Sequence, residues 1–109
     1  MSAEPDGVEI ELGSMIVDAA AEEERDVDVT VTARDANHLV TAVAGIEVKA
    51  HGRPLDSTHV EQLACKLNDM PALTRRGIVS ASGYFGPAQR KADKHGIDLL
   101  ELKDWDLSQ

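Results

Sequence analysis

Residues 39–50 of the chain read LVTAVAGIEVKA, and the segment shortly before them, 26–32, reads DVDVTVT. Valine occupies every second position of the earlier segment, and this alternation predicts a half-buried strand. The later segment is apolar along most of its length, which also predicts a strand. The turn-forming residues 33–38, ARDANH, separate the two. The segments are therefore predicted to pair as an antiparallel hairpin.

The second strand ends in a Glu-x-Lys pattern. Because residues two apart in a strand point the same way, Glu47 and Lys49 are expected to share a face, while Ile46 and Val48 face the core. Asp28 lies opposite the valines of the first strand, so the hairpin can place it on the same surface. Two converging carboxylates can hold a hard cation such as Mg²⁺, and a lysine beside them can offset charge on a phosphoryl group. The alternative interpretation is a solvated strand face with a neighbouring ion pair.

The chain after the hairpin alternates between helix and strand signals. A helix capped by Asp56 or Ser57 is predicted to run to Asp69, with a buried stripe of Val60, Leu63, Ala64 and Leu67. A strand over 76–82, a helix over 87–95 that ends at Gly96, and a strand over 97–102 are predicted to follow. Strand–helix–strand order implies a right-handed parallel crossover. The sheet should therefore be mixed, with helices on both of its faces.

The N-terminal part of the chain gives a different pattern. Residues 1–7 are small and polar and are predicted to be disordered. Apolar residues between 8 and 24 recur at three- and four-residue spacing, which predicts a helix with one buried stripe. The expected organisation is a disordered start followed by a single domain over 8–109, since 109 residues suffice for one core.

Composition constrains the class of protein. The formal net charge is −9, but residues 48–96 contain eight basic and four acidic side chains, so one face can still approach a polyanion. No apolar run approaches the ~20 residues of a membrane span, and nothing near Met1 resembles a signal peptide, so a cytoplasmic protein is expected. The single cysteine, Cys65, is predicted to fill space in the core.

The order of these motifs resembles a known class of enzymes. Asp on one strand, Glu-x-Lys on the next, and then helix, strand, helix and strand is the chain order of the PD-(D/E)xK nuclease superfamily. More narrowly, residues 26–102 resemble the Mrr-like restriction endonuclease catalytic domain. The likeness rests on DVDVTV, GIEVKAHGRP, the helix THVEQLACKL and the segment RGIVSASGYFGPAQRKADKHGIDLLEL. It implies an α/β, restriction-endonuclease-like fold: a central mixed β-sheet flanked by helices.

The resemblance also implies roles for the residues at the proposed site. Asp28 and Glu47 would be ligands of Mg²⁺, with Mn²⁺ as a possible substitute, and the carbonyl of Val48 would be a third ligand. Lys49 would be the catalytic lysine. Asp26 is an alternative to Asp28, because the short strand that usually precedes the aspartate strand in this family is missing here.

The family often places a polar residue, commonly glutamine, on the helix after the lysine, and either Glu61 or Gln62 matches that position. The implied activity is metal-dependent hydrolysis of DNA, with a possible homodimer or a separate recognition domain or subunit as partner. The alternative is a catalytically silent module of the same fold that binds nucleic acid or protein, or a fragment of a larger enzyme. Candidate contacts to the DNA backbone are Arg53, Arg75, Arg76, Arg90 and Lys91.

Overall fold

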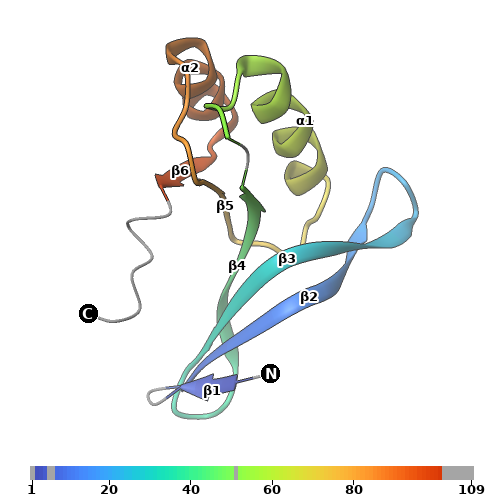
Figure 1. Cartoon of the computed structure of the whole chain (residues 1–109). Helices are drawn as coiled ribbons and strands as arrows, with labels where there is room; N and C mark the ends of the chain where they lie inside the picture. The colour runs from blue at the N-terminus through green and yellow to red at the C-terminus, as the bar shows by residue number, and fades with distance from the viewer. Residues whose placement is uncertain (1, 5–6, 51, 102–109) are drawn as a thin grey trace.

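The structure of this chain is a computed structural model that describes residues 2–4, 7–50 and 52–101. Within these residues, six strands and two helices follow one another along the chain (Figure 1). Their bounds are β1 (Ser2–Glu4), β2 (Val8–Asp18), β3 (Glu23–Arg34), β4 (Val40–Lys49), α1 (Ser57–Asn68), β5 (Arg75–Ser80), α2 (Gly86–His95) and β6 (Asp98–Glu101).

All six strands belong to one mixed sheet in the order β1-β2-β3-β4-β5-β6. The pairs from β1 to β4 are antiparallel, whereas β4, β5 and β6 run parallel to one another. The predicted β3–β4 hairpin and the predicted parallel crossovers are confirmed. The sheet thus has an antiparallel half and a parallel half, and they meet at β4.

Both helices cover the same face of the parallel half, where α1 and α2 pack against each other (Figure 1). The expectation of helices on both faces is therefore wrong. The strand order explains the difference, because β4–α1–β5 and β5–α2–β6 step across the sheet in the same direction. Two successive crossovers of the same hand then place their helices on one side.

The opposite face of the parallel half carries no helix in the described part of the chain. A shallow, mainly apolar hollow of about 550 Å³ lies there, with Ile46 and Leu100 among its lining residues. At its rim Arg75 donates to Asp98 at 2.7 Å. Because Arg75 is held in this ion pair on the face away from the helices, its guanidinium is at least partly neutralised there.

The predicted helix over residues 8–24 is wrong, because these residues form β2 and the start of β3. The two strands pair in register from Val8↔Ala33 to Asp18↔Glu23. The pattern misleads because hydropathy and burial are reversed near the end of β2. Ser14 and Asp18 are buried, whereas Met15 and Val17 lie largely exposed. The first residues of β2, VEIEL over 8–12, do alternate as in a strand, but the apolar run MIV over 15–17 breaks the alternation.

The N-terminus also differs from expectation. Ser2–Glu4, predicted as part of a disordered segment, form strand β1, which pairs with Val8–Ile10 of β2. Backbone hydrogen bonding to an existing strand edge can order a short polar segment that has no core of its own. The last residue of the predicted strand over 97–102 lies outside the described residues. None of the helices in the described part of the chain is long and apolar enough to cross a membrane.

The helices of the parallel half begin and end as the sequence predicts. The side chain of Asp56 accepts a hydrogen bond from the backbone N–H of His59 and caps α1. Gly96 adopts a left-handed conformation at the end of α2. Apolar residues of both helices and of β5 form the main core, which contains Leu55, Val60, Ala64, Ile78, Ala88, Ala92 and Ile97.

A second core cluster connects α1 to the hairpin. Val27 of β3 packs with Leu67, Met70 and Leu73 from the end of α1 and the loop that follows. Leu73 lies directly over Gly45 of β4, where a Cβ atom would come within 2.5 Å of Leu73 Cδ1. A glycine at this position lets the loop after α1 approach the sheet, and this close approach fixes α1 beside the end of β4.

Candidate active site

A hollow of about 380 Å³ opens between α1 and the neighbouring strands β3 and β4. Three of the residues singled out from sequence, Glu47, Lys49 and Gln62, line it together. The predicted shared face of Glu47 and Lys49 is therefore confirmed. The full lining is Arg25, Glu47, Lys49, Gln62, Leu63, Cys65, Lys66 and Asp69.

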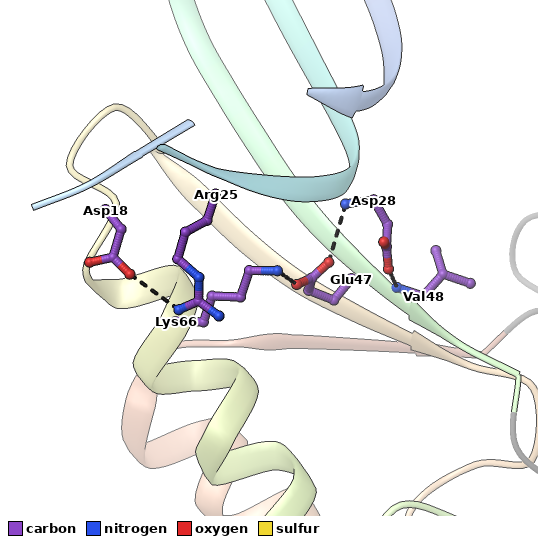
Figure 2. Close-up of polar contacts among 6 residues, drawn as sticks. All are labelled: Asp18, Arg25, Asp28, Glu47, Val48 and Lys66. Carbon is purple, nitrogen blue, oxygen red and sulfur yellow. Dashed lines mark hydrogen bonds and ion pairs between the residues drawn. The ribbon is translucent and has the colours of Figure 1, made fainter. Parts of the chain in front are cut away.

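Glu47 is the most deeply buried charged group of this hollow, with 3% of its surface exposed. Its Oε1 atom forms an ion pair and hydrogen bond with Lys66 Nζ, and Oε2 accepts from the backbone N–H of Asp28 at 3.2 Å (Figure 2). A buried carboxylate requires such partners, since burial of an unpaired charge is costly. The alternative of a solvated strand face therefore does not hold at Glu47, because α1 covers this face of the sheet.

Asp28 lies beside Glu47 at the point where β3 and β4 cease to pair. The last backbone pair of the ladder is Val29↔Ile46. Beyond this pair a side chain replaces the backbone as the partner of β4. The Asp28 Oδ2 atom accepts a hydrogen bond from the backbone N–H of Val48 at 2.8 Å (Figure 2). Two reciprocal bonds thus join the strands: Asp28 N–H to the Glu47 carboxylate, and Val48 N–H to the Asp28 carboxylate. The sequence alone pointed to this juxtaposition.

The two alternatives for the aspartate differ clearly in position. Asp26 is exposed and pairs with Met15 of β2, whereas Asp28 contacts the Glu47 segment directly. The expected burial of Val48 is wrong, because 38% of its surface is exposed, although Ile46 is buried as predicted. Val48 lies on the sheet face that no described helix covers, so little packs against it.

The helix residues also separate into two groups. Gln62 lines the hollow, whereas Glu61 does not, and Glu61 Oε1 lies 3.4 Å from Lys91 Nζ on α2. Of the two positions suggested by the resemblance, Gln62 is the one beside Glu47 and Lys49. Cys65, expected in the core, is exposed and lines the same hollow.

Sequence reasoning missed Lys66 and Arg25. Lys66 lies four residues after Gln62 on α1, and residues with this spacing share a helix face. That spacing was a usable signal, since it places Lys66 over the same end of β4. Arg25 gave no such signal, because it directly follows a segment that was predicted to be helical.

Arg25 connects the site to the β2–β3 turn. Its Nη1 donates to Asp18 Oδ2 at 3.2 Å, and Asp18 Oδ1 accepts from the backbone N–H of Ala21 at 2.9 Å. The hydrogen bond from Ala21, reinforced by Arg25, holds the pKa of Asp18 below its ordinary value, although burial opposes this shift. The backbone N–H of Ala19 also donates to the carbonyl of Asp69 at 2.8 Å, which ties the turn to the end of α1.

The candidate DNA-contacting residues do not form one surface. Arg76 donates to the backbone carbonyls of Leu67 at 2.7 Å and Met70 at 3.0 Å, so it caps the C-terminal end of α1. This position stabilises the helix through its dipole and its last carbonyl groups. Arg76 is therefore occupied in the fold, whereas Arg75 forms an exposed ion pair with Asp98 on the other face of the sheet. Arg53 is exposed in the loop before α1.

A separate basic hollow lies between the start of α1 and α2. Arg90, Lys91 and Lys94 line it together with Ser57 and Pro87. Its volume is about 360 Å³, and its basic groups come from one helix face. Of the five candidate DNA contacts, Arg90 and Lys91 line this basic hollow.

The donor set at Asp28 and Glu47 suits a loosely held hard cation. No group of three His, Cys, Asp or Glu side chains that could hold a metal occurs among residues 2–4, 7–50 and 52–101. Two carboxylates remain, on adjacent strands, and Asp28 Oδ1 has no hydrogen-bond partner among the described residues. Mg²⁺ commonly takes one or two carboxylates and completes its shell with water or substrate phosphate. These residues therefore fit such an ion, provided that water or phosphate supplies the remaining ligands.

Comparison with known proteins shows the fold. No protein-family model matches the sequence, and no curated protein matches it. The crystal structure of AF1548, a protein of unknown function, superposes with a TM-score of 0.69 at 20% identity, over 89% of this chain and 50% of the other. A repair endonuclease from Pyrococcus abyssi superposes with a TM-score of 0.58 at 17% identity, over 87% of this chain and 38% of the other. The chain spans half or less of these proteins.

These similarities define the fold class of the chain. The chain has an α/β, restriction-endonuclease-like fold, with a mixed sheet and two helices, and it shares this fold with the repair endonuclease from Pyrococcus abyssi.

Proposed function

We propose that this chain is a metal-dependent DNA endonuclease domain of the PD-(D/E)xK type. The observation that carries the proposal is the reciprocal pairing of Asp28 and Glu47 across the end of the β3–β4 ladder, with Lys49 and Gln62 in the hollow that Glu47 lines. The fold shared with a repair endonuclease supports it. The finer assignment to the Mrr-like group rests on the order of the motifs in the sequence.

Asp28, Glu47 and the carbonyl of Val48 would hold Mg²⁺, or Mn²⁺ in its place. When bound, such an ion lowers the pKa of a coordinated water and polarises a phosphoryl oxygen. Lys49, on the same strand face as Glu47, offsets the negative charge that develops on the phosphoryl group and orients the attacking water. Gln62 supplies an amide on the opposite wall of the hollow, where it can hydrogen-bond water or a phosphate oxygen.

The DNA backbone would approach from the helix side, because Arg90, Lys91 and Lys94 form the basic hollow between α1 and α2. Arg53 lies in the loop that connects β4, which carries Glu47 and Lys49, to the start of α1, which borders the basic hollow. One such site cuts one strand at a time, so double-strand cleavage requires a homodimer or two visits. A separate recognition domain or subunit would supply sequence preference.

The test uses supercoiled plasmid with Mg²⁺ or Mn²⁺. The wild-type chain should nick the plasmid, and Lys49→Ala should slow the nicking by roughly 10²–10³-fold, the loss expected for one preorganised electrostatic donor. Folding should be unaffected, as thermal melting would show. If the wild-type chain nicks nothing with either metal, the enzyme proposal fails.

Cys65 gives an independent readout of where DNA binds. It is the single cysteine of the sequence, it is exposed, and it lines the hollow with Glu47 and Lys49. Bound DNA should therefore slow its alkylation by a maleimide, and high salt should restore the rate as phosphate contacts are lost. Protection without nicking would favour the silent binding module. One observation favours that module, since protein groups already satisfy Glu47 in this structure.

A further inference from the structure

We propose that Lys66 is the resident counter-ion of Glu47 in the metal-free protein, and that a divalent metal binds by taking its place. This inference rests on the proposed function, because it concerns the same site. It assigns to Lys66 a role that the motif order did not suggest, namely control of metal affinity at a carboxylate ligand.

The burial of Glu47 requires a cation. Only 4% of its side-chain surface is exposed, and only 15% of that of Lys66. Loss of one member of a buried ion pair leaves an uncompensated charge and is strongly destabilising. In the absence of metal, Lys66 is the cationic group in direct contact with Glu47 in the described part of the chain. The pair therefore stabilises the fold when no metal is present.

The groups that donate hydrogen bonds to the Asp28 and Glu47 carboxylates differ in how easily they can move away. Glu47 Oε2 and Asp28 Oδ2 accept from backbone N–H groups of neighbouring strands, which are fixed by the sheet. Glu47 Oε1 is instead held by the end of a flexible side chain (Figure 2). A lysine has four rotatable bonds and can move its ammonium toward water while its stem stays packed. Oε1 is thus the oxygen that can be released without disrupting the sheet.

The exchange has an electrostatic consequence. A divalent cation on Glu47 supplies more charge than the ammonium, so the carboxylate stays compensated after Lys66 leaves. A metal in contact with Glu47 would also repel the Lys66 ammonium. Lys66 and the metal are therefore mutually exclusive on Oε1. The lysine lowers the apparent metal affinity, and it stabilises the fold of the metal-free protein.

The experiment measures Mn²⁺ affinity without DNA, by calorimetry and by the loss of the free Mn²⁺ paramagnetic resonance signal. The variants are Lys66→Met, Lys66→Arg and Arg34→Met. Lys66→Met keeps an apolar stem and removes the competing charge, so Mn²⁺ should bind about tenfold more tightly or better than to the wild type. Lys66→Arg keeps a cation on Glu47, so its affinity should be equal to that of the wild type or weaker.

Arg34→Met is the matched control. Arg34 Nε pairs with Glu9 Oε1 at 3.2 Å, and Arg34 lies six residues along β3 from Asp28, on the order of 20 Å away. This variant also removes one positive charge from an ion pair, so it reports the general effect of net charge. Its Mn²⁺ affinity should equal that of the wild type.

Thermal melting supplies a second readout that is independent of affinity. Without metal, Lys66→Met should melt below the wild type, and saturating Mn²⁺ should raise its melting temperature by more than that of the wild type. If Lys66→Met does not fold without metal, its folding on addition of Mn²⁺ supports the exchange, and failure to fold even with Mn²⁺ overturns it.

The outcomes separate the two proposals. If the wild-type chain binds Mn²⁺ and nicks DNA but Lys66→Met binds Mn²⁺ no more tightly, only the exchange is overturned. If neither the wild type nor any variant binds Mn²⁺, both the exchange and the metal-dependent nuclease are overturned. Tighter binding by Lys66→Met in a chain that cuts no DNA would support the exchange and contradict the nuclease.

Discussion

The two halves of the sheet obey different rules. In the parallel half, β4 to β6, two amphipathic helices cover one face. Three residues of the predicted stripe of α1, Val60, Ala64 and Leu67, are buried, and the fourth, Leu63, is partly buried. In the hairpin of β2 and β3, buried positions include Ser14, Asp18 and Thr30, while Met15 and Val17 are exposed. The candidate site lies between the halves, with Asp28 from the hairpin and Glu47 from the parallel half.

The difference shows that the structure of a strand is easier to predict from its hydropathy pattern when a helix covers the strand. A strand beneath a helix buries mainly apolar side chains, with the paired Glu47 as an exception in β4, so its sequence pattern indicates its structure. A hairpin that projects from the covered region can bury polar residues when they bond to one another. Here Ser14 and Thr30 share a hydrogen bond at 2.6 Å, and Asp18 pairs with Arg25.

The largest expected effect is the loss of nicking when either carboxylate of the site is replaced, Asp28 of the hairpin or Glu47 of the parallel half. Asp28→Asn keeps an oxygen that can accept from Val48 N–H, so the fold should persist, with nicking reduced at least about 100-fold by weaker metal binding. Glu47→Gln should abolish nicking to a similar extent and should also destabilise the fold by about 1–3 kcal/mol, since Lys66 loses its acidic partner. Plasmid nicking and urea unfolding measure the two effects.

Equal stability of these two variants would contradict the assignment of Glu47 as the buried member of the pair. A conservative control is Glu47→Asp, which keeps the charge but shortens the side chain.

The next effect tests the close approach of the parallel half to the loop after α1. Gly45→Ala places a Cβ atom against Leu73, and overpacking of this kind should cost about 1–3 kcal/mol in the free energy of unfolding. The matched control is Gly52→Ala, where no atom lies within 4 Å of the added Cβ in the described structure. Urea denaturation of both variants measures the difference, and equal stability would mean that Leu73 does not rest on Gly45.

A smaller effect concerns the polar interior of the hairpin. Ser14→Ala leaves the buried hydroxyl of Thr30 without its partner and should cost on the order of 1 kcal/mol. Adding Thr30→Val should recover part of that loss, because the unsatisfied hydroxyl is then removed. A double-mutant cycle measures the coupling, and strictly additive losses would contradict a direct bond between the two hydroxyls.

The smallest effect is a pH dependence. The pKa of Asp18 is held below its ordinary value of 3.8, mainly by the N–H of Ala21. A depressed folded-state pKa gives stability that is present above pH 3.8 and is lost as the pH falls through the lower folded-state value. The melting temperature of Asp18→Asn should therefore lie below that of the wild type at pH 7, and the gap should shrink below pH 3.8.

Asp56, the cap of α1, gives the corresponding measurement in the parallel half. The backbone N–H of His59 lowers its pKa as well, so Asp56→Asn should show a gap of the same sign with the same pH limit. A gap that stays constant down to pH 2 in either variant would contradict ionised capping at that position.

The sequence by itself determined the β3–β4 hairpin, both helices with their caps, the parallel strands and the pairing of Asp28 with the Glu47 segment. It could do so because period-two and helical patterns are local and because the helices cover β4 to β6. Only the tertiary structure decided that both helices lie on one face, that Gln62 rather than Glu61 lines the hollow, and that the strand beginning at Val8 continues to Asp18. It also decided that Lys66 contacts Glu47. These outcomes depend on which surfaces meet, and a buried polar residue is stable only when a distant partner, such as Thr30 for Ser14, satisfies it.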